Sequence, residues 1–178
     1  MKKTVLLLIS GLMALALTGC SLFTSGFGKD AESARTIEIS DDMIHEVPTD
    51  LEYANEYIYY APEISDDSKS LYEEKYDTTL EKDFFILYSD KDDAPLRAYY
   101  YLVLGDEAGA EKVKEYLEQN GDYEITVNGK NICYIQNQES LNTTIDSLIA
   151  MSFMTEKTGR AYVDMYCGMD KLTEYVPE

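Results

Sequence analysis

The residues of this chain best suited to catalysis or metal binding are His45, its only histidine, and the cysteines Cys133 and Cys167. A nucleophile needs an adjacent base, yet His45 lies in an acidic, weakly patterned stretch far from either cysteine in the sequence. Structural zinc needs several Cys or His ligands at short spacing, which these three residues do not provide. We therefore expect no catalytic triad, no metal and no cofactor.

A second candidate is the acidic turn from Asp90 to Asp93, whose carboxylates resemble the start of a calcium loop. Such a loop needs an acidic or amide residue at its fifth position, a glycine at its sixth and a glutamate at its twelfth. Ala94, Pro95 and Tyr101 occupy those positions here. The pattern therefore favours an ordinary solvated turn over a calcium site.

The remaining motifs are explained by packing or chance. Four methionines could offer soft thioether ligands to copper(I), but methionine at helical spacing favours core packing. A GDEAG run, residues 105–109, lacks the lysine of a phosphate loop. An Asn-Thr-Thr sequon, residues 142–144, falls in an expected helix. The methionines are Met151, Met154, Met165 and Met169.

The amino-terminal twenty residues are the most specific signal. Lys2 and Lys3 precede an apolar run that ends in Leu17-Thr18-Gly19-Cys20, which is the pattern of a secretory signal peptide. Its end resembles the lipobox of bacterial lipoproteins. The resemblance implies that Cys20 receives a diacylglyceryl group, that residues 1–19 are removed, and that the protein is held on a bacterial membrane facing outside the cytoplasm. The apolar run is shorter than the roughly 20 residues that span a bilayer.

This reading divides the chain into a signal peptide (1–19), a lipidated end with a flexible tether (20–34) and one domain (35–178). The lipid bilayer is then a partner, reached through the acylated Cys20. Outside the cytoplasm a disulfide between Cys133 and Cys167 is permitted. Sequence spacing does not show that their Cα atoms come within bridging range, so two separate buried thiols remain the alternative.

Acidic residues dominate the composition. The chain has 34 acidic and 15 basic residues and a formal net charge of −19, which becomes −21 when Lys2 and Lys3 leave with the signal peptide. Nucleic-acid binding needs clustered Lys and Arg, so nucleic acid is excluded as a partner. A solvated, repulsive surface is the plain explanation. A more specific explanation is a docking face for a basic envelope partner or for cations.

Tyrosine is also abundant, with 16 residues against 5 Phe and no Trp. Tyrosine combines a large apolar body with a polar tip, which suits both cores and interfaces. We expect at least two of six tyrosines to lie together on the surface as a binding patch, with the filling of a thin core as the alternative. The six are Tyr53, Tyr57, Tyr59, Tyr60, Tyr99 and Tyr101.

Local patterns predict the elements of the first half of the domain. Residues 36–40 alternate as a strand does. Residues 48–58 fit a helix that begins at Pro48, although 57–60 also fit a strand. An N-cap among residues 65–67 precedes a charged helix that continues to about Lys82. Residues 84–88 and 97–104 are apolar on both faces, which indicates buried strands.

The second half is patterned more clearly. Asp106 is the expected N-cap of a helix that Gly121 ends at C′. Asn128-Gly129 predicts a two-residue turn between strands 123–127 and 131–136. A long helix from Glu139 runs to about Lys157, and residues 161–167 fit either a strand or a helix. The patterns of residues 83–157 thus predict the order β-β-α-β-β-α. This order is typical of an α+β fold with helices on one face of a mainly antiparallel sheet.

No pattern past Cys20 names a chemistry. We expect a membrane-anchored binding or interaction module of the cell envelope that is not an enzyme. Two alternatives remain open, a small-ligand or cation-binding lipoprotein that serves a membrane machine, and an enzyme that relies on carboxylates. A deep pocket of converging polar groups would favour either alternative.

Overall fold

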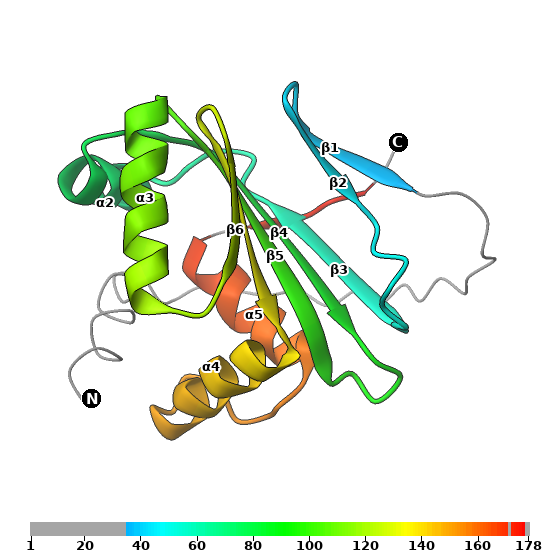
Figure 1. The fold of residues 1–178 in the computed structure, drawn as a ribbon. Coiled ribbons are helices and arrows are strands. Elements are labelled where there is room, and N and C mark those ends of the chain that lie inside the picture. Colours follow the sequence, from blue (N-terminus) through cyan, green and yellow to red (C-terminus); the bar gives the residue numbers. More distant parts are fainter. Residues whose placement is uncertain (1–34, 171, 177–178) are drawn as a thin grey trace.

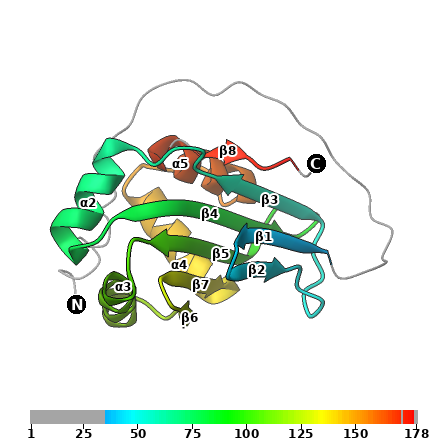
Figure 2. The ribbon, with the colours of Figure 1, turned by 90° about the horizontal axis from the view of Figure 1, so that it is seen from above.

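A six-stranded antiparallel sheet forms the centre of the fold. The computed structural model describes residues 35–170 and 172–176 of the chain. The strand order is β6-β7-β5-β4-β3-β8, and a separate two-stranded sheet pairs β1 with β2. Figures 1 and 2 show α4 and α5 on one side of the large sheet and the β1–β2 hairpin on the other. The elements are β1 (Thr36–Ser40), β2 (Met43–Glu46), β3 (Asn55–Tyr60), α2 (Asp66–Tyr76), β4 (Leu80–Ser89), β5 (Pro95–Leu104), α3 (Glu107–Asn120), β6 (Glu124–Asn128), β7 (Asn131–Asn137), α4 (Gln138–Ala150), α5 (Gly159–Asp170) and β8 (Thr173–Glu174).

The two longest strands, β4 and β5, form the centre of the sheet and pair with Phe85 opposite Tyr100. Successive side chains of a strand point to opposite faces, so Phe85 and Leu87 face the helices while Ile86 and Tyr88 face the hairpin. All four are fully buried. Both faces of these strands are covered, which is why their sequences are apolar without alternation.

The helices cover one face of the sheet, which confirms the predicted α+β architecture. Helices α4 and α5 pack over the middle of this face through Leu141, Ile145 and Val163, all buried. Helices α2 and α3 close the end of the same face, where Ala110 and Val113 meet Leu104. The predicted order β-β-α-β-β-α over residues 83–157 is present.

The β1–β2 hairpin covers the opposite face. Ile37, Ile39 and Met43 point inward and pack on Ile86 and Tyr99 of the sheet. Strand β1 was expected from its alternation, whereas β2 was not. Because the hairpin covers this face, the sheet has a second hydrophobic core on the side away from the helices.

The predictions for residues 48–82 are partly wrong. No helix begins at Pro48, and residues 55–60 form β3, which pairs with β4 along its whole length. Pairing with a buried strand satisfies the backbone groups of that segment that point toward β4. Ser65 caps α2 as expected, but the helix ends at Tyr76. Asp77 adopts the left-handed conformation (φ 54°) there, and the chain then turns into β4.

The predicted long helix from Glu139 to Lys157 is also wrong, because α4 ends at Ala150. Ser152 is left-handed (φ 65°). Its N–H donates to the Ile149 carbonyl, and the Phe153 N–H donates to the Leu148 carbonyl. This pattern is a Schellman motif, formed here around a serine where glycine is usual. Residues 159–170 then form α5, which decides the open choice at 161–167 in favour of a helix.

Two turn details differ from expectation. Strands β6 and β7 pair as predicted, but Asn128 pairs with Asn131, so the two-residue loop is Gly129-Lys130. Gly129 alone of the two has a positive φ (58°), as at the first position of a type II′ turn. Gly121 ends α3 in an extended conformation (φ −163°). Its lack of a side chain is required because a Cβ there would lie 2.1 Å from the Tyr123 ring.

Candidate functional site

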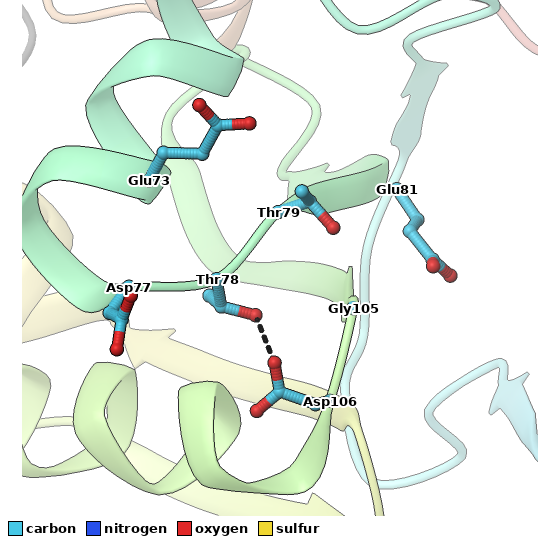
Figure 3. A pocket seen from close by; sticks show the side chains of 7 residues that line it. All are labelled: Glu73, Asp77, Thr78, Thr79, Glu81, Gly105 and Asp106. Carbon is cyan, nitrogen blue, oxygen red and sulfur yellow. Dashed lines mark hydrogen bonds between the residues drawn. The ribbon is translucent and has the colours of Figure 1, made fainter.

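A polar hollow of about 430 Å³ lies between the end of α2 and the start of α3. Figure 3 shows the residues around it, which come from α2, from the segment that leads into β4, from the start of β4 and from the turn before α3. The hollow is open to solvent. Four of its seven lining residues are acidic, and the seven are Glu73, Asp77, Thr78, Thr79, Glu81, Gly105 and Asp106.

Asp106 is held firmly in this hollow as the N-cap of α3. Its Oδ1 accepts the Gly109 N–H at 2.7 Å, and its Oδ2 accepts the Thr78 hydroxyl at 3.1 Å. The Gly109 N–H and the Thr78 hydroxyl hold the pKa of the Asp106 carboxyl below its usual value. Asp106 is therefore ionised at neutral pH and joins α3 to the segment before β4.

Two other carboxylates of the hollow have basic partners. Asp77 lies 3.3 Å from Lys112 Nζ, and Glu81 lies 2.5 Å from Lys130 Nζ. Both pairs are exposed, so each contributes little to stability. Among residues 35–170 and 172–176, no group of three or more His, Cys, Asp or Glu side chains is placed to hold a metal ion. The hollow offers a negative, hydrated surface for a cationic group.

The acidic turn between β4 and β5 has a structural role. Asp90 Oδ1 accepts the N–H groups of Asp92 and Ala94 at 2.9 and 2.8 Å, which closes an Asx-type turn. Asp93 reaches the start of α5, where its Oδ2 accepts the Arg160 N–H at 2.9 Å. The turn was expected to be solvated, but the Asp93 carboxylate is drawn into contact with a helix far along the chain.

Among the candidate residues, His45 has the position that differs most from the one expected from the sequence. It lies on β2 and is 1% exposed, so the expectation of a weakly structured position is wrong. Its Nδ1 lies 2.6 Å from the Tyr101 hydroxyl and its Nε2 lies 2.8 Å from the Tyr88 hydroxyl. The Tyr99 ring lies edge-on to the imidazole, with 4.7 Å between the two ring centroids. Burial, with a smaller effect of the nearby Arg35, lowers the pKa of His45 to about 4.

The two cysteines of the domain lie on opposite faces of the sheet. Cys133 on β7 is buried under the hairpin with Tyr101, and Cys167 on α5 packs among the helices. Neither thiol is in a disulfide bond, so the disulfide that the sequence permitted is not formed. Burial raises the pKa of the Cys133 thiol to about 11, which leaves it protonated and a poor nucleophile at neutral pH.

The expected tyrosine patch is absent from the described surface. Tyr59, Tyr99 and Tyr101 are buried, and the other three of the six are half-buried. The half-buried ones are also divided, since Tyr57 packs on the helix side and Tyr53 on the hairpin side. The alternative of a tyrosine-filled core is what the structure has.

The methionines are core residues where the structure describes their side chains. Met154 is buried, and Met151 and Met165 pack around the same core, while the side chain of Met169 lies outside the described residues. The 142–144 sequon lies on α4, as expected. Cys20 and the signal peptide also lie outside the described residues.

No helix in residues 35–170 is long and apolar enough to cross a membrane. No protein-family model matches the chain, and no curated protein or solved structure matches it.

Proposed function

We propose that this chain is a bacterial lipoprotein whose acidic domain binds a basic partner at the cell envelope, outside the cytoplasm, without catalysing a reaction. The proposed lipid anchor is inferred from Leu17-Thr18-Gly19-Cys20 at the end of an apolar run. The first described element begins at Thr36. The intervening residues then act as a tether with a reach of roughly 20 Å.

The binding half of the proposal is supported by the acidic hollow and by its surroundings. Helix α2 begins with Asp66 and Asp67, and α3 begins with Glu107. Glu107 adds negative charge beside the hollow, whereas Asp66 and Asp67 add it at the far end of α2. A field of one sign attracts an oppositely charged partner and speeds encounter. A basic protein segment therefore suits this end of the domain.

A small cationic ligand is the second candidate, because the hollow's volume falls within the roughly 300–1,000 Å³ range of ligand sites. The openness of the hollow and its lack of apolar lining side chains favour the flexible side chains of a protein partner over an enclosed small molecule.

Replacement of Cys20 by serine tests the anchor. We expect Cys20→Ser protein to stay unprocessed or to leave the membrane fraction, because serine has no thiolate to take the lipid. Cell fractionation with immunoblotting checks this result. Cys167→Ser, which removes a cysteine of the domain, should fractionate like the wild type. A Cys20→Ser protein with the mass and location of the wild type would contradict the anchor.

Charge reversal tests the binding face. A decalysine peptide serves as the probe for binding to the full-length protein in detergent, followed by fluorescence anisotropy. We expect Glu73→Lys, inside the hollow, to weaken binding about fivefold. Glu118→Lys makes the same charge change at an exposed site of α3 outside the hollow and should weaken it less than twofold. Equal losses would mean that the hollow is not the site, and binding of spermine in place of the peptide would favour the small-ligand alternative.

A further inference from the structure

The β1–β2 hairpin is attached to the domain differently from every strand of the large sheet. It forms its own two-stranded sheet. Across the described residues, the hydrogen bonds that join it to the large sheet all involve side chains. Two examples are Ser40 Oγ to Asn131 Oδ1 at 3.2 Å and Lys82 Nζ to the Ile39 carbonyl at 3.2 Å. An isolated two-stranded hairpin is marginally stable in water, so β1 and β2 depend on this side-chain contact.

His45 is the one titratable side chain that the hairpin itself, residues 36–46, buries in that contact. Ile37, Ile39 and Met43 make up the rest of the buried hairpin face. A neutral imidazole has one donor and one acceptor, so one of its tyrosine partners donates to it and the other accepts from it. A protonated imidazole has two donors, so the hydroxyl that donated must turn its hydrogen elsewhere and accept instead. Protonation thus forces the hydroxyl pair to rearrange and leaves a charge in an aromatic core.

Among the residues that the structure describes, the hydrogen-bond partners of the His45 ring are hydroxyls and not carboxylates. Glu56 on β3 acts on the Tyr88 hydroxyl rather than on the ring, and its Oε2 is paired with Arg35. The positive charge of Arg35 opposes protonation of His45. The titratable groups around the ring are Tyr88 from β4, Tyr99 and Tyr101 from β5, Cys133 from β7 behind Tyr101, Glu56 from β3, Arg35 before β1, and Glu46 beside His45 on β2.

We propose that the β1–β2 hairpin is an acid-released strap, which protonation of His45 detaches from the sheet while the sheet and its helices stay folded. Release uncovers Tyr88, Tyr99 and Tyr101, the aromatic face that the closed hairpin buries. Resting on the proposed anchor, it also adds the hairpin's residues to the tether between Cys20 and the domain. The detachment itself does not depend on the anchor.

The expected size of the effect follows from the two states of His45. Its pKa is about 4 in the closed hairpin and takes the ordinary value of about 6.5 in a released one. The lowered pKa stabilises the closed form above pH 6.5, and that stabilisation is lost as the pH falls from 6.5 toward 4. Linkage then raises the open-to-closed ratio about 20-fold from pH 7 to pH 5.

Hydrogen–deuterium exchange of the full-length protein in detergent measures this opening. After correction for the intrinsic effect of pH, amide protection in residues 36–46 should fall about 20-fold from pH 7 to pH 5, while protection in β4 and β5 stays unchanged. His45→Gln, which does not titrate, should remove the pH dependence. Met43→Leu, which alters the same buried face without a titrating group, should keep it. A pH-independent hairpin, or equal losses in β4 and β5, would overturn the proposal.

A second measurement does not need a His45 variant to fold. The chain has one histidine, so protein made without a histidine tag gives a single imidazole signal in a proton NMR titration. We expect a midpoint well below 6.5 with a hairpin-specific change in exchange over the same pH range. A midpoint at the ordinary 6.5 would overturn the strap. Failure of the Cys20→Ser test would remove the anchor and leave this result unaffected.

Discussion

At the scale of single residues, the domain depends on places where a missing side chain lets two segments touch. Gly109, in the first turn of α3, is the clearest. A Cβ at this position would lie 2.3 Å from the Thr78 Cβ. Thr78 also donates its hydroxyl to Asp106, the N-cap of the same helix. The glycine therefore allows the cap, the helix and the segment before β4 to meet at the edge of the acidic hollow.

Alanine at two helical glycines should have opposite effects. Alanine favours a helix over glycine by roughly 1 kcal/mol, but overpacking costs about 1–3 kcal/mol. We expect Gly109→Ala to lower the free energy of unfolding by about 1 kcal/mol. Gly168→Ala on α5, where a Cβ meets nothing within 4 Å, should raise it by about 0.5–1 kcal/mol. Urea titrations measure both, and a stabilised Gly109→Ala would contradict the close packing at Thr78.

At the scale of elements, Asp93 fastens helix α5 to the β4–β5 turn. Besides the Arg160 N–H, its carboxylate accepts the Ser89 hydroxyl at 2.6 Å and the Tyr57 hydroxyl at 2.9 Å. The Asp93 carbonyl also accepts the Gly159 N–H at 2.7 Å. One residue thus caps a helix from outside it and ties that helix to two strands. Burial and the contact with Asp93 raise the pKa of the Tyr57 hydroxyl, which stays protonated and donates.

Loss of this carboxylate should loosen α5. An N-cap contributes about 1 kcal/mol and a hydrogen bond to a charged group about 1.5–3 kcal/mol, so we expect Asp93→Ala to lower the free energy of unfolding by about 3 kcal/mol. Hydrogen exchange in α5 should rise as well. Asp92→Ala is the control, because Asp92 is exposed in the same turn and uses only its backbone N–H there. Similar losses in the two variants would show that Asp93 is not the cap of α5.

At the scale of the whole molecule, an excess of negative charge opposes folding. The chain carries 34 acidic against 15 basic residues. Its ion pairs, such as Asp77–Lys112 and Glu81–Lys130, are exposed and contribute at most about 1 kcal/mol each. Unpaired acids on α2 and α3 repel one another in the folded state. The repulsion outweighs the pairs because acids outnumber bases by more than two to one.

Salt should therefore stabilise the protein. Screening lengths fall from tens of ångströms at low salt to under 10 Å near physiological ionic strength. We expect the Tm to rise by about 2–4 °C between 10 and 300 mM NaCl, which corresponds to roughly 1 kcal/mol for a chain of this size. Replacing the exposed Glu74, Glu115 and Glu118 with glutamine should reduce that rise. A Tm that falls with salt would mean that attractive ion pairs dominate.

Features that depend on neighbouring residues could be predicted from the sequence. The doubly apolar segments 84–88 and 97–104 are buried strands because each presents apolar side chains to both faces. Ser65 and Asp106 begin helices because their side chains accept N–H groups three residues ahead. The β6–β7 pairing followed from a glycine between two alternating runs, although the loop lies one residue later than expected.

The tertiary structure alone decided the features that depend on residues far apart in the chain. His45 is buried by Tyr88 and Tyr101, which lie 43 and 56 positions away. Asp93 caps a helix that begins 66 positions later. The end of α4 required a left-handed serine, a conformation that sequence patterns assign to glycine. Cys133 and Cys167 are separated by a sheet whose order the sequence does not specify. In each case the deciding free energy is a contact across the fold, and local propensity carries no information about its partner.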